Sequence, residues 1–139
     1  MGLLDKIKSA ASALTGGADV FVDINDVERG VATPISIRGV AKKDNKISSV
    51  YLLVRATEHA AVENEKQTET VSYETRIEIS GAQDLKQGEE YNWEGEINLP
   101  STINPSFRGK MIRHTWEVKG GLNVNGIDPA SDWREIEVR

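Results

Sequence analysis

The sequence has 139 residues, and its 22 acidic against 17 basic side chains give a net charge of −5. This length predicts one domain, and the acidic balance argues against a nucleic-acid backbone as the main partner, because binding phosphates needs a positive surface. The absence of cysteine excludes disulfides and thiolate metal sites, and with the absence of a secretory signal it favours a cytoplasmic location.

The first seventeen residues are predicted to form a short amphipathic helix and a Gly-Gly linker. A helix this short is marginal alone in water, so its apolar stripe is expected to dock on a partner. We rank its own sandwich or a protein partner ahead of a membrane, because the stripe has no aromatic residue. The residues expected to make this partner or membrane contact recur at helical spacing, and they are Leu3, Leu4, Ile7 and Leu14.

From Ala18 onward the hydrophobic period changes to two, which predicts strands with one buried and one wet face. Turn-forming residues separate the strands, and their uneven spacing favours an antiparallel β-sandwich over a closed barrel. The polar stretch 58–69 has no clear period and is predicted to be an exposed loop. The expected strands include residues 20–24, 35–38, 50–56, 71–79, 91–99, 112–119 and 135–139.

The chain offers little material for catalysis. Neither His59 nor His114 has a second ligand or a catalytic partner at a meaningful spacing, and no nucleophile motif or phosphate-binding glycine loop is present. We therefore expect no enzymatic activity, no cofactor and no metal. Gly120 and Gly121 are expected to relieve crowding or to mark a bulge, and Asp128 before a proline is expected to begin a turn.

The aromatic residues divide into two groups by their phase in the strands. Tyr91, Trp93 and Trp116 share a face with apolar residues, so we expect them in the core rather than in a stacking platform. Trp133 lies out of phase with the apolar residues that follow it. We expect Trp133 to cover an end of the sandwich or to belong to a contact surface.

Several motifs in the second half of the chain resemble the arrestin domain. The segments in question are Leu99-Pro100-Ser101, Pro105-Ser106-Phe107-Arg108-Gly109 and Trp116-Glu117-Val118-Lys119. The stretch Gly121-Leu122-Asn123-Val124-Asn125-Gly126-Ile127-Asp128-Pro129 is similar to the bacterial sporulation-control branch of that superfamily. The resemblance covers most of the chain from about residue 18. It implies a single immunoglobulin-like sandwich over 18–139 that works as an adaptor or scaffold without enzymatic activity.

The resemblance has limits. Arrestins pair two such domains, and this chain has room for one. The residues that serve activation and phosphate sensing in animal arrestins have no counterpart here, so receptor or phosphate recognition is not implied.

We therefore expect a protein-binding adaptor whose partners are other proteins or a second copy, reached through a sheet edge or the N-terminal helix. One alternative is a module that binds carbohydrate or another small ligand through Tyr51 or Trp133, which predicts a cleft lined by aromatic faces. The other alternative is a membrane-surface protein attached by residues 3–14.

Overall fold

The structure is a computed structural model that describes residues 17–61 and 67–139. Within these residues it contains β-strands and no helix. The expected helix, with Leu3, Leu4, Ile7 and Leu14, lies outside the described residues.

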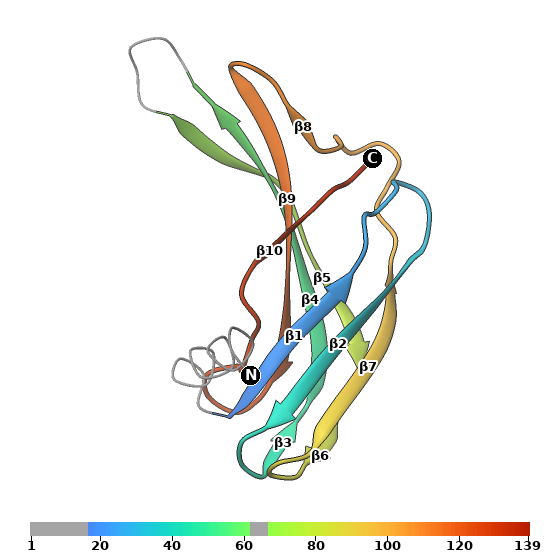
Figure 1. The fold of residues 1–139 in the computed structure, drawn as a ribbon, viewed down its shortest axis with the longest axis vertical. Coiled ribbons are helices and arrows are strands. Elements are labelled where there is room, and N and C mark those ends of the chain that lie inside the picture. The colour runs from blue at the N-terminus through green and yellow to red at the C-terminus, as the bar shows by residue number, and fades with distance from the viewer. Residues whose placement is uncertain (1–16, 62–66) are drawn as a thin grey trace, which may run out of the picture.

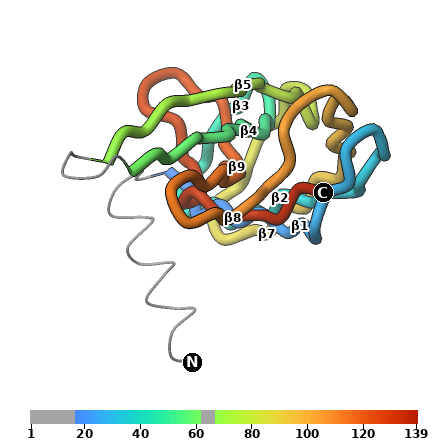
Figure 2. Tube along the Cα trace, turned by 90° about the horizontal axis from the view of Figure 1, so that it is seen from above, coloured from blue at the N-terminus to red at the C-terminus, as the bar shows by residue number. Residues whose placement is uncertain are grey.

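Two antiparallel sheets face each other across the core, as in a β-sandwich (Figures 1 and 2). The smaller sheet has the order β1-β2-β7, and the larger one has the order β10-β9-β4-β5, with β8 also paired to β9. A two-stranded sheet of β3 and β6 lies at one end. The strands are β1 (Ala18–Ile24), β2 (Thr33–Ala41), β3 (Asn45–Ile47), β4 (Ser49–Ala60), β5 (Thr68–Ser80), β6 (Gln83–Leu85), β7 (Glu90–Ile97), β8 (Phe107–Arg108), β9 (Ile112–Asn123) and β10 (Arg134–Ile136).

The core lies where the predicted alternation places it. Ile35 and Ile37 of β2 point inward from one sheet, and Leu52 and Val54 of β4 point inward from the other. Trp116 is fully buried between them, and its ring lies 5.5 Å from that of Tyr73. Burial of these apolar faces is the main source of stability, because removing apolar surface from water is favourable.

The two long sides of the sandwich differ. On one side Val27 and Val138 form a parallel bridge, and the amide of Arg139 donates to the carbonyl of Val27 at 2.9 Å. On the other side, within the described part of the chain, β5 pairs only with β4 and β7 pairs only with β2. Ile79 of β5 fills the space beside Gly95 of β7, where an added Cβ would lie 3.0 Å from its Cδ1. This second side therefore carries two sheet edges.

The larger sheet extends beyond the smaller one at the end formed by the β4–β5 and β8–β9 hairpins (Figure 1). The prediction of a loop over 58–69 is wrong at both ends, because β4 runs to Ala60 and β5 begins at Thr68. The register of β5 against β4 shifts between Ala56 and Thr57, and this bulge interrupts the period of two. The shift also places Val71 opposite Thr57, on the other face of β5 from Tyr73, so Val71 is 50% exposed although the alternation predicts it inward. Ile112 begins β9 at the end where the larger sheet extends beyond the smaller one, and it is 44% exposed.

Gly120 and Gly121 relieve crowding, which is one of the two predicted roles. A Cβ on Gly120 would lie 2.7 Å from Cγ2 of Val22, and one on Gly121 would overlap the ring of Tyr51. The pairing of β4 with β9 continues through both glycines without a register shift, so they mark no bulge.

Candidate functional site

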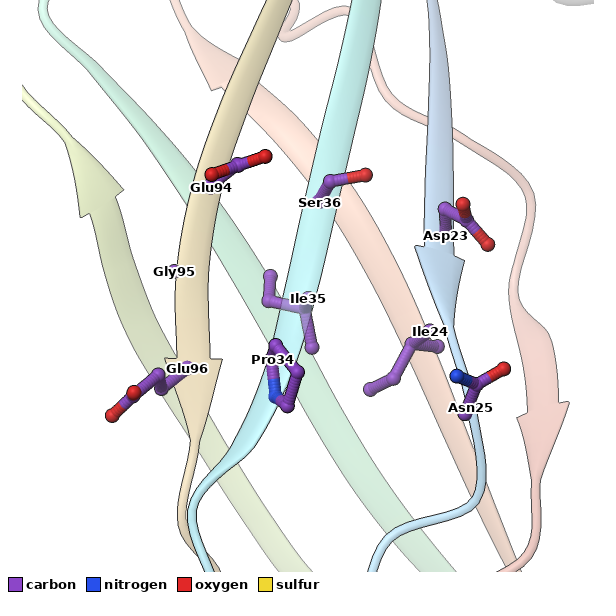
Figure 3. A pocket seen from close by; sticks show the side chains of 9 residues that line it. All are labelled: Asp23, Ile24, Asn25, Pro34, Ile35, Ser36, Glu94, Gly95 and Glu96. Atoms are coloured by element: carbon purple, nitrogen blue, oxygen red, sulfur yellow. The ribbon is translucent and has the colours of Figure 1, made fainter.

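The outer face of the smaller sheet carries a hollow of about 510 Å³ (Figure 3). Asp23 lies opposite Ser36, and Ser36 lies opposite Glu94, so these three side chains form one row across the three strands. Glu96 and Pro34 form the next row. The same alternation that sends the isoleucines of β2 into the core sends these polar residues to solvent.

Carboxylates dominate this hollow, which we call the acidic hollow. Asp23, Glu94 and Glu96 are exposed, and none of them forms an ion pair with another described residue. A second hollow of about 340 Å³ adjoins it and shares Asp23. There the guanidinium group of Arg38 lies 5.2 Å from the ring centre of Phe21. The sheet therefore presents three unneutralised carboxylates on a fixed backbone, which suits hydrogen bonds and ion pairs with cationic groups.

The acidic hollow is not arranged as a metal centre. Among residues 17–61 and 67–139 no group of three or more histidine or carboxylate side chains could hold a metal ion.

Trp133 lies on the outer side of the larger sheet and is half-buried. The guanidinium group of Arg55 sits 4.0 Å from its ring centre, and the ammonium group of Lys119 sits 5.7 Å away. Arg55 also lies 3.5 Å from a carboxylate oxygen of Glu117. Trp133 therefore anchors a cluster of charged side chains and does not form part of the core.

Tyr51 is also covered. It is 6% exposed, and the guanidinium group of Arg76 lies 3.9 Å from its ring centre. Burial, and secondarily the hydrogen bond that its hydroxyl donates to Asp128, raises the pKa of Tyr51 to about 12. Both aromatic residues considered for carbohydrate binding thus have a ring face occupied by arginine, which leaves less surface for stacking a sugar.

The prediction that Asp128 begins a turn is wrong, because the chain bends before it, at residues 125–127, and Asp128 closes that turn. Its Oδ1 accepts a hydrogen bond of 3.0 Å from the amide of Val124, and the amide of Leu122 donates to the carbonyl of Pro129 at 2.9 Å. Gly126 has a φ of 111°, a conformation that favours glycine. Sequence reasoning missed the bond to Tyr51, because that partner lies 77 residues earlier.

His114 is 2% exposed and contacts the segment before β8 at Pro105. Its Nδ1 lies 2.9 Å from the carbonyl oxygen of Pro105 and therefore donates to it, and its Nε2 lies 2.6 Å from Oγ of Ser72. The ring of Phe107 stacks on His114 at 5.8 Å, and Trp116 meets it edge-on at 5.7 Å. The sequence search did not find this pairing, because 42 residues separate the serine from the histidine. The imidazole, packed between aromatic rings, thus links Ser72 of β5 to the backbone of Pro105.

The other histidine, His59, also has local contacts. Its Nε2 lies 3.0 Å from Oγ1 of Thr115, and its Nδ1 lies 3.2 Å from a carboxylate oxygen of Glu69.

The turn between β8 and β9 exposes several apolar side chains that the sequence analysis did not single out. Phe107, Met111 and Ile112 are 42%, 47% and 44% exposed. Lys110 and Arg113 lie among them, are exposed, and form no ion pair with other described residues. No helix in the described part of the chain is long and apolar enough to cross a membrane.

No protein-family model matches the chain, and no curated protein matches it in sequence. Among solved structures, the chain is similar to the crystal structure of Spo0M, a sporulation control protein from Bacillus subtilis. The TM-score is 0.68 and the identity is 19%, over 89% of this chain and 50% of that one. The chain thus spans about half the length of the protein it matches. The likeness concerns the fold, and at that level it supports the resemblance to sporulation-control proteins that the motifs predict.

Proposed function

We propose that this chain is a non-catalytic regulatory module of the cytoplasm that binds a basic segment of another protein in the acidic hollow. The observation that carries the proposal is the set of three carboxylates, Asp23, Glu94 and Glu96, which line one hollow and have no cationic partner among the described residues. The fold likeness to a protein titled as a sporulation control protein supports the regulatory role.

The geometry of a sheet suggests which basic segment fits. Glu94 and Glu96 are two residues apart on β7, so their backbones are spaced by about 7 Å along the strand. An extended segment with Lys or Arg at every second position repeats with the same spacing. Exposed ion pairs contribute about 0.2–1 kcal/mol each. Several are needed at once, so the complex is expected to be transient and sensitive to salt.

The test is a titration of ¹⁵N-labelled chain with an extended peptide of alternating Lys and Thr, followed by two-dimensional NMR. We expect shifts that saturate at Asp23, Ser36 and Glu94, and an affinity that falls as salt is added. A peptide of alternating Glu and Thr is the matched ligand control. Shifts scattered over the whole surface, or equal shifts with both peptides, would contradict the proposal.

A matched pair of variants sharpens the test. The substitutions Asp23→Asn, Glu94→Gln and Glu96→Gln together remove the negative charge of the hollow. The substitutions Glu28→Gln, Glu58→Gln and Asp132→Asn remove the same charge from exposed residues that do not line it. Only the first set is expected to abolish binding, because net charge changes equally in both.

A second candidate function is contact with an anionic lipid surface through the β8–β9 turn. Apolar side chains flanked by cations are the combination that enters a membrane interface, and Met111 and Ile112 with Lys110 and Arg113 provide it. Co-sedimentation with phosphatidylcholine vesicles, with and without phosphatidylserine, tests it. Binding that needs phosphatidylserine and is lost in Met111→Ser/Ile112→Ser would favour this candidate, and no sedimentation with either vesicle would remove it.

A further inference from the structure

The exposed edge of β5 is the longest stretch of sheet that the described residues leave without a neighbour. β5 spans 13 residues and pairs, within the described part of the chain, only with β4. Natural edges are often protected by proline, charged side chains, bulges or a short length. β5 is long and has no proline, and the charged residues Glu74, Arg76 and Glu78 in its middle alternate in sign. Its unpaired backbone amides and carbonyls can therefore accept another strand.

Only the middle of β5 is regular enough to pair without distortion. Its register with β4 shifts between Ala56 and Thr57 and again between Val50 and Tyr51. Ser72 and Ile79 are the residues of β5 that these shifts leave without a partner. Residues 73–78 lie between them and keep an unbroken register. A strand added at this edge would thus be centred within residues 73–78.

We propose that two copies of this chain pair antiparallel through β5, with Thr75 of one copy opposite Thr75 of the other. This inference is independent of the proposed function. Directly opposite residues of two antiparallel strands point to the same side of the sheet. For two identical strands related by a two-fold axis, this holds only when one residue lies opposite its own copy, on the axis. The candidate axes that leave at least three regular residues paired on each strand therefore lie at positions 74, 75, 76 and 77.

Charge selects among these axes. An axis at Glu74 places the two Glu74 carboxylates opposite each other, and an axis at Arg76 does the same with the two guanidinium groups. Like charges directly opposite are destabilising. An axis at Thr75 instead places each Glu74 opposite Arg76 of the second copy, which gives two opposite-charge pairs.

The remaining axis, at Ile77, pairs Arg76 with Glu78 of the second copy. It keeps only residues 76–78 in the regular stretch, whereas the axis at Thr75 keeps residues 73–77. Arg76 already donates to Glu78 of its own chain at 2.7 Å, while Glu74 has no ion pair among the described residues. The axis at Thr75 therefore brings a cation to Glu74, the carboxylate without an ion pair, and each Arg76 is shared between its own Glu78 and Glu74 of the second copy.

The apolar face of the strand agrees with this register. Tyr73 and Ile77 are partly buried and pack against the core. With the axis at Thr75, each Tyr73 lies opposite Ile77 of the second copy, and aromatic–β-branched pairs of this kind stabilise neighbouring strands. The two larger sheets would then join into one continuous sheet through a backbone ladder.

A cysteine scan tests the register directly, because the chain has no cysteine of its own. Single substitutions Glu74→Cys, Thr75→Cys, Arg76→Cys and Ile77→Cys are oxidised with glutathione disulfide and run on non-reducing gels. Thr75→Cys is expected to cross-link most, since directly opposite Cβ atoms approach disulfide distance. Thr68→Cys, near the start of the same strand, is the control and should stay monomeric. Strongest cross-linking at another position, or equal cross-linking at all of them, would overturn the proposal.

Sedimentation equilibrium of cysteine-free variants tests the charge pairing. Glu74→Arg and Arg76→Glu are each expected to weaken dimerisation by about tenfold, and the double variant should recover most of the affinity. Circular dichroism confirms that each variant is folded. A wild-type chain that stays monomeric at about 1 mM, a concentration at which even weak specific pairs associate, would refute the dimer. An unchanged dissociation constant in Glu74→Arg would refute this register.

Discussion

The hydroxyl group of Tyr51 donates a hydrogen bond of 2.7 Å to Oδ2 of Asp128, although 77 residues separate the two. The other oxygen of that carboxylate accepts from the amide of Val124. One side chain thereby holds the loop after β9 in its turn and ties that loop to β4. The carboxylate of Asp128 therefore connects β4 to the loop that follows β9.

Replacing Tyr51 with Phe removes the link and keeps the ring. We expect the free energy of unfolding to fall by about 1.5–3 kcal/mol, because the acceptor is a charged carboxylate. Urea denaturation at pH 8 measures the change. Asp128→Asn and the double variant complete a thermodynamic cycle, and a coupling energy near zero would mean that the bond contributes nothing.

Burial of the Tyr51 hydroxyl, and secondarily the same bond, makes stability depend on pH in the alkaline range. The pKa of Tyr51 is raised from 10 to about 12 in the folded chain, so the folded state holds its proton more tightly than the unfolded state does. The stabilisation is complete below pH 10 and is lost as the pH rises through 12. The difference in unfolding free energy between wild type and Tyr51→Phe should shrink over this interval. A constant difference would contradict the assignment.

Gly120 is required by the close approach of the two sheets. Gly120→Ala places a Cβ 2.7 Å from Cγ2 of Val22, and overpacking of this kind costs about 1–3 kcal/mol. Adding Val22→Ala removes the clashing methyl group and should recover part of the loss. Gly81→Ala is the control, since no atom lies within 4 Å of its added Cβ. Equal denaturation midpoints for the two alanine variants would show that the contact is not limiting.

Ser72 and His114 have the separation of a nucleophile and its base, so the non-catalytic proposal can be tested there. We expect no covalent adduct at Ser72 with a fluorophosphonate probe, because the ring of His114 is buried and packed by Phe107 and Trp116. Intact-mass spectrometry of wild type and Ser72→Ala decides the matter. An adduct on wild type alone would make this pair an activated nucleophile and would contradict the proposal.

Trp133 and Trp116 should respond very differently to truncation. Trp116→Ala empties a fully buried position and is expected to cost about 3–5 kcal/mol. Trp133→Ala removes a half-buried ring beside Arg55, where a cation–π contact contributes about 0.5–2 kcal/mol depending on its desolvation. Urea denaturation of both variants measures the contrast. A loss at Trp133 as large as at Trp116 would place Trp133 in the core.

The sequence was sufficient to predict most strands and their buried faces. Ile35 and Ile37 alternate with polar residues and face the core as expected, since the smaller sheet has one wet side. The pattern failed at Val71, because a register shift between β4 and β5 moves this residue to the other face of the sheet and leaves no mark in the sequence. It failed at Ile112, because alternation records the pleat of a strand and not whether a second layer lies opposite. How far each sheet extends past the other depends on tertiary packing.

The candidate site was harder to foresee. Asp23, Ser36 and Glu94 come from three strands that are neighbours only in the folded sheet, and a solvent-facing Asp or Glu is unremarkable in any single strand. The same holds for the contact of Ser72 with His114. Sequence reasoning placed Trp133 outside the core correctly, because its phase relative to Ile136 and Val138 is a local property.

The bridge between Val27 and Val138 also determines when this sandwich can form. The amides of Val27 and Arg29 donate to the carbonyls of Glu137 and Arg139, more than a hundred residues away. Closing so long a loop costs conformational entropy before the backbone bonds form. Topologies rich in such non-local contacts fold in milliseconds to seconds. While residues 137–139 are still emerging during synthesis, the segment 27–29 has no backbone partner, and this side of the sandwich stays open.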